Sequence, residues 1–448
     1  MRRREFFRTA MASSAAAALL SQKEAVAQEA SARAARGMAM PKIRDIKVIE
    51  CAPKGSRLDV VKIITDQDGL YGYGCATFTQ RADLIKPAVD LYLKPLLVGR
   101  TVDRIEDIWQ MAYNSSYWRN GPVENNAISG VDQALWDIKG RMAGMPVYQL
   151  LGGKAREAVD LYAHADGAEI QEVVDNAKKF IDQGFRHVRM QVGVPGMAGY
   201  GARQAGQRFP SIHNEPVFER ETAKRRALAM FEQARKQLGA EVELLHDAHE
   251  RYTPTEAIQF AKDLEQFRLF FLEDVLSPED IIWFQNIRAA SSTPLAMGEL
   301  FNSPHEWTPL IKDRLIDYMR MHISQMGGIT PARKVAAMGE IFNVRTAWHG
   351  PGDVSPIGHM AMLHLDLTCT NFGIQEYTPF NATSQEVFHG CPEMRGGYLY
   401  ANDKPGWGME IDEKAAAAHP FRTGARNGVD LNGGWGELRL PDGQIVKQ

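Results

Sequence analysis

The sequence predicts an α/β fold, in which a TIM-type β/α barrel follows a smaller α+β domain. Three observations predict it: three strand-like runs near residue 42, helix-like segments after them, and a regular alternation of strands and helices after residue 153. With 448 residues, 44% of them hydrophobic, the chain is long enough for both domains. The net charge of −3 gives no electrostatic case for nucleic acid or an anionic membrane, so we expect a small-molecule partner.

Residues 1–27 have the composition of an export signal. Arg2, Arg3 and Arg4 precede an Ala-rich stretch at 9–20 and small residues at 25–27, the order of basic region, apolar region and cleavage site. The apolar stretch is shorter than the ~20 residues that span a bilayer. Arg3-Arg4 before Glu5-Phe6-Phe7 resembles a twin-arginine signal, which predicts a periplasmic protein without membrane attachment after cleavage. A permanent anchor and a basic tail are the alternatives, and residues 28–41 are expected to form a linker.

The next segment, residues 42–155, is predicted to be the α+β domain. Its strand candidates are the runs IRDIKVIECA, LDVVKIITD and LYGYGCATF, with DQDG as the clearest turn between them. The helical patterns RIEDIWQMAY and AISGVDQALWDIKGRMAG follow. The four cysteines, at 51, 75, 369 and 391, are far apart and adjoin apolar runs, so buried thiols are expected.

Residues 156–380 are predicted to form the barrel. Eight apolar runs each end in a polar residue: VDLYAH, FRHVRMQ, EVELLHD, LFFLED, TPLAMGE, LIDYMR, VRTAWH and NFGIQE. Helix-period stretches separate most of them, and in such a barrel the functional groups lie at the C-terminal ends of the strands. One interval, from Arg189 to Asp247, is long, so we expect an inserted loop near residues 193–217 over the barrel mouth.

Three acidic residues, Asp247, Glu273 and Glu299, end successive strand candidates at equal intervals of 26 residues. Adjacent strands lie about 4.8 Å apart, so these side chains can approach one another. Three uncompensated carboxylates would raise one another's pKa, and a divalent cation removes this conflict. Oxygen ligands favour Mg²⁺ over Zn²⁺. For any one of these acids alone, a helix N-cap would be the ordinary role.

A histidine and several cations accompany these acids. Alternation along the strand would place His249 on the same face as Asp247, where an imidazole can protonate a leaving hydroxyl. Arg320 and His349 end other strand candidates, Arg189 lies near the end of another, and these groups suit an anionic substrate. A structural role is the alternative for a single buried histidine.

The motifs HDAHE, FFLED, MGELFN, DYMR, WHGPGDVSP and FGIQEY, with YWRNGP and ALWDIKG upstream, resemble the mannonate dehydratase subgroup of the enolase superfamily. The resemblance covers residues 42–412. It implies an α+β capping domain on a (β/α)₇β barrel, with residues 381–448 returning to the cap, and a homo-oligomer of up to eight subunits. It also implies one Mg²⁺ per subunit on Asp247, Glu273 and Glu299.

The resemblance further assigns the roles of the other residues. His249 would be the general acid, and Tyr200, paired with Arg189, the base. Substrate-binding positions map onto His164, Arg320, His349, Asp353, Glu376 and Thr79. The expected reaction removes the C2 proton of a C6 aldonate, D-mannonate or D-gluconate, and expels the C3 hydroxyl to give a 2-keto-3-deoxy acid. The enzyme would be a hydro-lyase.

The chain departs from the subgroup's pattern at four places. The interval from Arg189 to Tyr200 is one residue short, Thr79 replaces an Asn, the C-terminus lacks a Trp, and Pro351 stands where efficient mannonate dehydratases have Ala. The Pro resembles members that act weakly on mannonate or prefer gluconate. Two alternatives stay open: a racemase or cycloisomerase of the same superfamily, and a binding or regulatory relative that has lost turnover. The second strand candidate, FRHVRMQ, lacks the Lys-x-Lys pair that racemases of this superfamily use.

Overall fold

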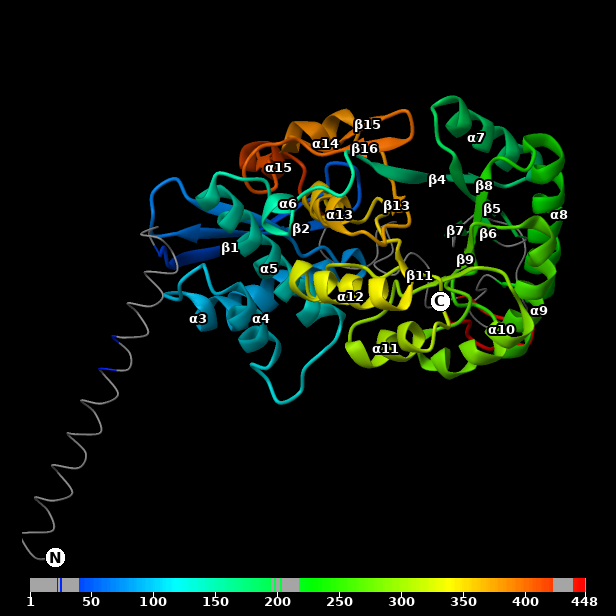
Figure 1. Cartoon of the computed structure of the whole chain (residues 1–448), viewed down its shortest axis with the longest axis horizontal. Helices are drawn as coiled ribbons and strands as arrows, with labels where there is room; N and C mark the ends of the chain where they lie inside the picture. The colour runs from blue at the N-terminus through cyan, green and yellow to red at the C-terminus, as the bar shows by residue number, and fades with distance from the viewer. Residues whose placement is uncertain are drawn as a thin grey trace, which may run out of the picture.

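The computed structural model of the chain describes residues 40–194, 217–421 and 438–447, together with residues 22, 25, 197–198 and 202–203. Figure 1 shows two parts along the long axis: a small sheet with its helices at one end, and a barrel surrounded by helices at the other. The helices α12 and α13 lie between the two parts in this view. The export-signal prediction for residues 1–27 falls almost entirely outside the described residues.

The first domain is an antiparallel three-stranded sheet covered by helices. Its strands pair in the order β1-β2-β3. The elements are β1 (Ile43–Cys51), β2 (Leu58–Thr65), β3 (Tyr71–Cys75), η1 (Thr79–Leu84), α2 (Ile85–Ala88), η2 (Val89–Leu93), α3 (Lys94–Leu97), α4 (Ile105–Tyr113), α5 (Pro122–Ala143) and α6 (Val147–Leu150). The strands and long helices that the sequence predicted in this region are therefore present.

Helix α5 packs directly against β3 because small residues line their contact. A Cβ added to Gly74 would come within 2.0 Å of the carbonyl oxygen of Gly130, so only glycine allows this approach. Gly144, at φ 64°, ends α5 in the left-handed conformation that favours glycine. Gly74 and Gly130 therefore let the cap's longest helix lie close to its sheet.

The second domain is a closed barrel of eight parallel strands. Seven pair in the order β12-β11-β10-β9-β8-β5-β4, and β13 pairs with β4. A parallel bridge between Thr346 and Phe372 joins the two ends and closes the barrel. The strands are β4 (Val159–Gly167), β5 (His187–Val192), β8 (Glu243–Asp247), β9 (Phe271–Glu273), β10 (Leu295–Met297), β11 (Tyr318–Met319), β12 (Arg345–Thr346) and β13 (Gln375–Glu376).

A helix connects each strand of the barrel to the next, which gives the predicted (β/α)₇β order. The connections are α7 (Ile170–Asp182), α8 (Arg220–Leu238), α9 (Pro254–Leu264) with η3 (Glu265–Phe267), η4 (Pro278–Trp283) with α10 (Phe284–Ala290), α11 (Pro304–Lys312), α12 (Ile329–Phe342) and α13 (Pro356–Thr368). Capping boxes start two of them, Thr253 with Glu256 at α9 and Ser303 with Glu306 at α11. The backbone pairs β6 (Met197–Ala198) and β7 (Ala202–Arg203) lie in the predicted insertion.

Apolar side chains fill the barrel interior. One cluster takes a buried residue from five of the eight strands, together with the residue after β12 and the residue before β13: Tyr162, Leu245, Phe271, Ala296, Tyr318, Ala347 and Ile374. Such a layer closes the barrel below its mouth, so that polar side chains gather only where the strands end.

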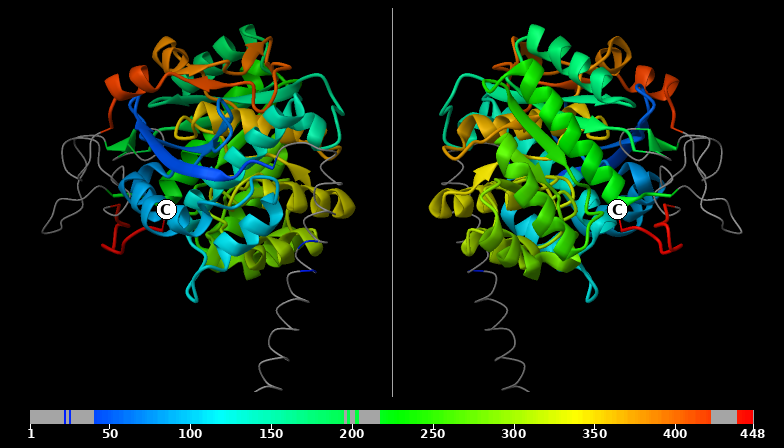
Figure 2. Two further views of the ribbon diagram at one scale, coloured as in Figure 1. Left: turned by 90° about the vertical axis from the view of Figure 1, so that its left-hand side faces the viewer. Right: turned by 90° about the vertical axis from the view of Figure 1, so that its right-hand side faces the viewer.

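The C-terminal part of the chain touches both domains. It contains α14 (Ala382–Val387), β14 (Phe388–His389), β15 (Glu393–Arg395), β16 (Tyr398–Tyr400), β17 (Glu410–Ile411) and α15 (Glu413–Ala418). Trp407 is fully buried, and its indole N–H donates to the carbonyls of Tyr73 and Gln133 in the cap. Beyond it, residues 438–447 lie against the barrel near Phe218, whose backbone N–H donates to Arg439. Figure 2 shows this last segment, in red, at the side of the molecule.

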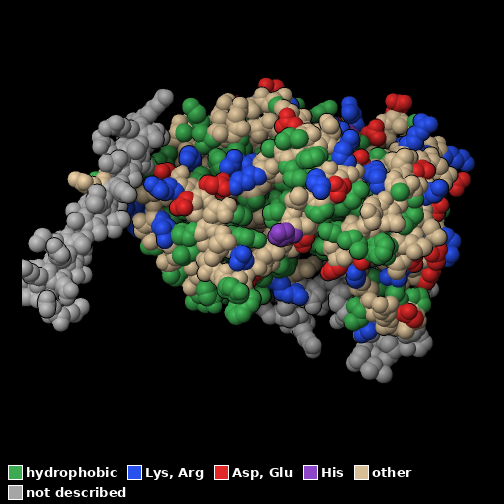
Figure 3. Space-filling model, turned by 60° about the horizontal axis from the view of Figure 1, so that its bottom comes forward, with side chains coloured by type: hydrophobic (Ala, Val, Ile, Leu, Met, Phe, Trp, Pro, Cys, Tyr) green, Lys and Arg blue, Asp and Glu red, His purple; other side chains and the backbone are tan. Residues whose placement is uncertain are grey.

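Charged residues are mixed on the face drawn in Figure 3, where Lys and Arg lie among Asp and Glu. In the part of the chain that the structure describes, no helix is long and apolar enough to cross a membrane. All four cysteines are free thiols; Cys51 and Cys75 are buried, as predicted, whereas Cys369 and Cys391 are only half-buried.

Candidate active site

A cavity of about 510 Å³, with mostly charged and polar wall residues, lies at the C-terminal ends of the barrel strands, beneath the cap. We call it the reaction cavity. Its walls contain most of the residues singled out in the sequence. They are Ser56, Gln80, His164, Arg189, His249, Glu250, Asp274, Glu299, Leu300, Arg320, His349, Pro351, Gly352, Asp353 and Glu376.

Asp247 and Glu273 end β8 and β9 and are register partners in the sheet. Both are buried, and the guanidinium Nη1 of Arg189 lies 3.3 Å from Asp247 Oδ2 and 3.2 Å from Glu273 Oε1. Glu299 comes two residues after β10 ends at Met297. The first two of the predicted metal ligands are therefore direct neighbours.

Arg320 joins the third acid to this group. Its Nη1 lies 2.6 Å from Glu299 Oε2, and its Nε lies 3.0 Å from Glu273 Oε2. Its Nη2 donates to Glu376 at 3.1 Å. Among the described residues, no three acidic, histidine or cysteine side chains already converge as a metal site, because these guanidinium groups lie between the carboxylates. The three acids share one network through two arginines.

The cation site can be tested against the charge of the mouth. Seven acidic side chains gather there, against three arginines: Asp247, Glu250, Glu273, Asp274, Glu299, Asp353 and Glu376 against Arg189, Arg251 and Arg320. Burial, followed by the charge of Glu273, raises the pKa of Asp247 well above its usual range. A hard divalent cation would relieve this excess of carboxylates, and the oxygen donors of Asp247, Glu273 and Glu299 fit Mg²⁺. The residues therefore fit the metal.

The backbone turns sharply after β8 and β9. His249 and Glu250 have φ values of 54° and 60°, and Asp274 has 43°, conformations that non-glycine residues rarely adopt. Strand alternation therefore does not place His249, contrary to our expectation, because β8 ends at Asp247. The turn places it instead, and the backbone N–H of His249 donates to Asp247 Oδ1 at 2.8 Å. Such strain commonly accompanies functional sites.

His249 lies in an environment that favours its neutral form. Burial, and then the charges of Arg251 and Arg189, lower its pKa well below the usual value. An anionic ligand in the reaction cavity would raise the pKa of His249. The protonation of His249 therefore depends on the charge of the bound ligand.

Glu376 anchors the opposite wall. Burial alone would raise the pKa of this carboxyl, but Arg320 and His164 outweigh burial and hold it well below the usual value. Arg189 Nη2 donates to His164 Nδ1 at 3.1 Å, so the His164 proton is on Nε2, which lies 2.8 Å from Glu376 Oε1. This chain of contacts fixes the orientation of His164.

The structure brings together most of the predicted site residues. Asp353 lines the reaction cavity with the others. Tyr200, the predicted base, and the side chain of Thr79 lie outside the described residues. The adjacent Gln80 does line the cavity.

Three residues of the mouth were not predicted. Asp274 accepts from Arg320 Nη1 at 3.0 Å, and burial raises its pKa to about 8. Glu250 lines the cavity beside it. His322 is buried, with its Nδ1 2.7 Å from Nδ1 of His349. The acidic pairs in HDAHE and FFLED were a visible signal for the first two, whereas nothing in the local pattern marked His322.

Comparison with known families accounts for both domains. Residues 51–152 match the mandelate racemase / muconate lactonizing enzyme N-terminal domain. Residues 172–415 match the enolase C-terminal domain-like family, which is more than half of the chain. The resemblance to the enolase superfamily is thus confirmed.

Similar proteins cover nearly all of the chain. A D-galactonate dehydratase family member of Salmonella enteritidis is 50% identical over 90% of this chain and 97% of its own length. The family member RspA of Pantoea ananatis is 51% identical over 90% of this chain. A crystal structure of an enolase from Pantoea ananatis with bound D-gluconate and Mg is 50% identical, with a TM-score of 0.86, over 91% of this chain and 100% of its own. The chain therefore belongs to the D-galactonate dehydratase family of the enolase superfamily, a family of hydro-lyases.

Proposed function

We propose that this protein is a Mg²⁺-dependent dehydratase that converts a C6 aldonate into a 2-keto-3-deoxy acid, with D-gluconate preferred to D-mannonate. The observation that carries the proposal is the reaction cavity, where Asp247, Glu273 and Glu299 adjoin two arginines and His249. The 50% identical structure with bound D-gluconate and Mg supports the same ligand pair here.

Removal of the C2 proton is the difficult step, since the substrate then carries two negative charges. Mg²⁺, held by Asp247, Glu273 and Glu299, would stabilise the charge that develops on the substrate carboxylate. Tyr200 is proposed as the base, on resemblance alone. Arg189 lines the cavity with its guanidinium beside Asp247 and Glu273, and its charge would lower the pKa of a nearby phenol.

His249 is proposed to protonate the C3 hydroxyl as it leaves. A low pKa makes a protonated imidazole a strong acid, and the anionic substrate beside it favours the protonated form until the hydroxyl departs. The resulting enol tautomerises to the 2-keto acid.

Substrate hydroxyls would be bound by the remaining groups of the cavity. Glu376 can accept hydrogen bonds, and His164 and His349 line the cavity with it. Pro351 also lines the cavity and replaces the Ala of efficient mannonate dehydratases. This substitution is the reason for placing gluconate first.

A panel of C6 aldonates tests the proposal directly. Purified protein with Mg²⁺ should release 2-keto-3-deoxy product from D-gluconate faster than from D-mannonate or D-galactonate. Asp247→Asn should abolish this, and Glu243→Gln, at the opposite end of the same strand, should not. Thermal stabilisation by gluconate without product would instead indicate a binding protein that has lost turnover.

The N-terminal sequence also supports a periplasmic location. Arg3-Arg4 and the short apolar stretch after it carry this proposal. Cell fractionation of the full chain and its Arg3→Lys/Arg4→Lys variant tests it. The wild type should appear in the periplasm and the variant in the cytoplasm, and equal distribution would contradict the assignment.

A further inference from the structure

A second cavity of about 510 Å³ adjoins the first, between the cap and the barrel. We call it the cap-side cavity. The two cavities share six wall residues, which makes them neighbours: Gln80, Glu250, Glu299, Leu300, His349 and Asp353. Cavities of about 300 to 1,000 Å³ already hold drug-sized ligands. The reaction cavity alone can therefore hold a six-carbon acid, and the cap-side cavity is room beyond it.

Two acceptor atoms in the walls of the cap-side cavity lack partners among the described residues. His322 is only 8% exposed, and its Nδ1 is occupied by His349. Its Nε2 has no hydrogen-bond partner. Asn302 uses its amide nitrogen on the carbonyl of Leu300, which leaves its Oδ1 without a donor. Buried acceptors of this kind favour a ligand that brings hydroxyl groups.

The charge of the cap-side cavity excludes a second anion. Glu279, Glu299 and Glu306 line it, whereas Lys447 is the only Lys or Arg among its described wall residues. The Lys447 ammonium is already 2.8 Å from Asp280 and donates to Ser277 at 3.0 Å. A phosphate or a second carboxylate placed here would face these carboxylates, and none of the described wall residues offers a free cation.

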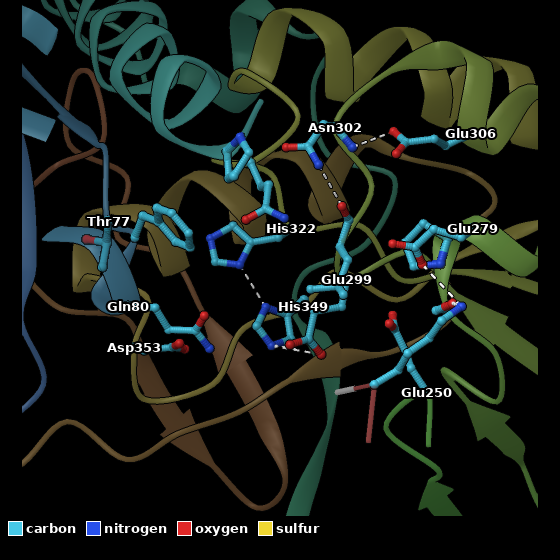
Figure 4. Close-up of a pocket in the computed structure, with 17 residues that line it drawn as sticks. Thr77, Gln80, Glu250, Glu279, Glu299, Asn302, Glu306, His322, His349 and Asp353 are labelled. Carbon is cyan, nitrogen blue, oxygen red and sulfur yellow. Dashed lines mark hydrogen bonds and ion pairs between the residues drawn. The ribbon is translucent and has the colours of Figure 1, made fainter. Parts of the chain in front are cut away.

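The cap-side cavity also has an apolar side. Phe78 and Pro122 of the cap are among its wall residues. Figure 4 shows His322 and His349 in contact between the cap residues Thr77 and Gln80 and the barrel residues Glu299 and Glu250. A sugar ring presents hydroxyls at its edge and C–H groups on its faces, which matches walls of both kinds.

We propose that the cap-side cavity binds a neutral sugar ring linked to the distal end of the sugar acid. The substrates of this enzyme then include aldonic acids that carry a glycosyl group, while distal phosphates and carboxylates are excluded. The proposal rests on the proposed function, because the carboxylate end must lie in the reaction cavity.

Calorimetric titration of the full-length protein with Mg²⁺ tests this by binding, without requiring turnover. The ligands are gluconate, its 6-O-glucosyl derivative (gentiobionate), its 4-O-glucosyl derivative (cellobionate), glucarate and 6-phosphogluconate. At least one glycosylated acid should bind as tightly as gluconate or tighter. Glucarate and 6-phosphogluconate should bind at least about tenfold more weakly than gluconate, which is the scale of one unfavourable charged contact. Binding of gluconate with exclusion of both glycosylated acids would overturn the proposal, and failure of every sugar acid would overturn the proposed function itself.

Two variants locate the glycosyl group. Asn302→Leu removes the acceptor and Phe78→Ala the apolar wall, so each should lower the affinity for the bound glycosylated acid about tenfold more than that for gluconate. Asn176→Leu on α7, whose amide donates to Asp166 outside both cavities, is the matched control and should leave this ratio unchanged. If Asn302→Leu does not fold, Phe78→Ala decides alone. Equal losses for both ligands in the folded variants would contradict the assignment.

Discussion

The Nδ1 atoms of His322 and His349 lie 2.7 Å apart, so one of these imidazoles donates a proton to the other. Nε2 of His349 lies 3.3 Å from Glu299 Oε2, and a carboxylate only accepts. His349 therefore has its hydrogen on Nε2, and His322 donates from Nδ1. Burial lowers the pKa of both rings, which favours this neutral arrangement. The donation from His322 thus supports the tautomer that His349 adopts beside Glu299.

Replacing His322 tests this relationship. His322→Phe removes the donor and should lower kcat about 10- to 100-fold, the scale found when a group that orients a functional imidazole is lost. His322→Asn keeps an N–H donor near the position of Nδ1 and should retain most of the rate. Steady-state kinetics on the best aldonate measures both. If the two variants lose the same activity while remaining equally stable, His322 has only a packing role.

Mg²⁺ should stabilise the folded protein through Asp247, Glu273 and Glu299. A ligand present at 100 times its Kd adds about 2.7 kcal/mol to the free energy of unfolding. Chelation should remove this increment and all turnover. In Glu273→Gln the increment should shrink, because one of three charged ligands becomes neutral.

Thermal unfolding with and without Mg²⁺ gives the increment for each variant. Glu243→Gln, at the start of β8, is the control and should keep the wild-type value. A full Mg²⁺ increment in Glu273→Gln would remove this residue from the ligand set.

His249→Asn separates proton abstraction from loss of the hydroxyl. The base and the metal ligands are intact in this variant, so exchange of the C2 proton with deuterium should continue while 2-keto-3-deoxy product falls by about 100-fold or more, the contribution of a general acid. NMR in D₂O follows both. Normal dehydration would show that His249 is structural, and loss of exchange as well would assign it to the first step.

The sequence predicted the barrel because polar residues recur where each apolar run ends. Asp247, Glu273 and Glu299 were found by their equal spacing, and the structure places the first two side by side. Asp274 and Glu250 were missed because side chains alternate along a strand. A residue next to one that faces the barrel interior is then expected to face outwards. Their positive φ values bring them to the mouth instead.

Contacts between residues of different strands could not be predicted from the sequence, because they also depend on the three-dimensional path of the chain. His322 and His349 are 27 residues apart, and their pairing depends on how two loops pack. The same holds for the cap-side cavity, which forms only where Phe78 and Pro122 of the cap face Asn302 and His322 of the barrel. The periodicity of the sequence predicts which strand end a residue occupies. It does not predict which cap residue lies in contact with it.

Asp366 on α13 should make the stability of the protein depend on pH. It is fully buried, and its Oδ1 accepts from Thr346 Oγ1 at 2.9 Å and from Trp348 Nε1 at 3.0 Å. Burial raises its pKa to about 8, whereas an unfolded Asp titrates near 3.9. Between these two values the folded state holds a proton that the unfolded state has released.

The contribution of Asp366 is therefore complete below about pH 3.9 and is lost as the pH rises towards 8, at about 1.4 kcal/mol per pH unit. Asp366→Asn keeps the acceptor for Thr346 and Trp348 but cannot ionise. The difference between wild type and variant in the free energy of unfolding, measured with denaturant from pH 5 to pH 8, should shift steadily against the wild type. Asp263→Asn, at an exposed acid that water screens, should leave the wild-type slope unchanged. Parallel curves for wild type and Asp366→Asn would mean that Asp366 is ionised inside the folded protein.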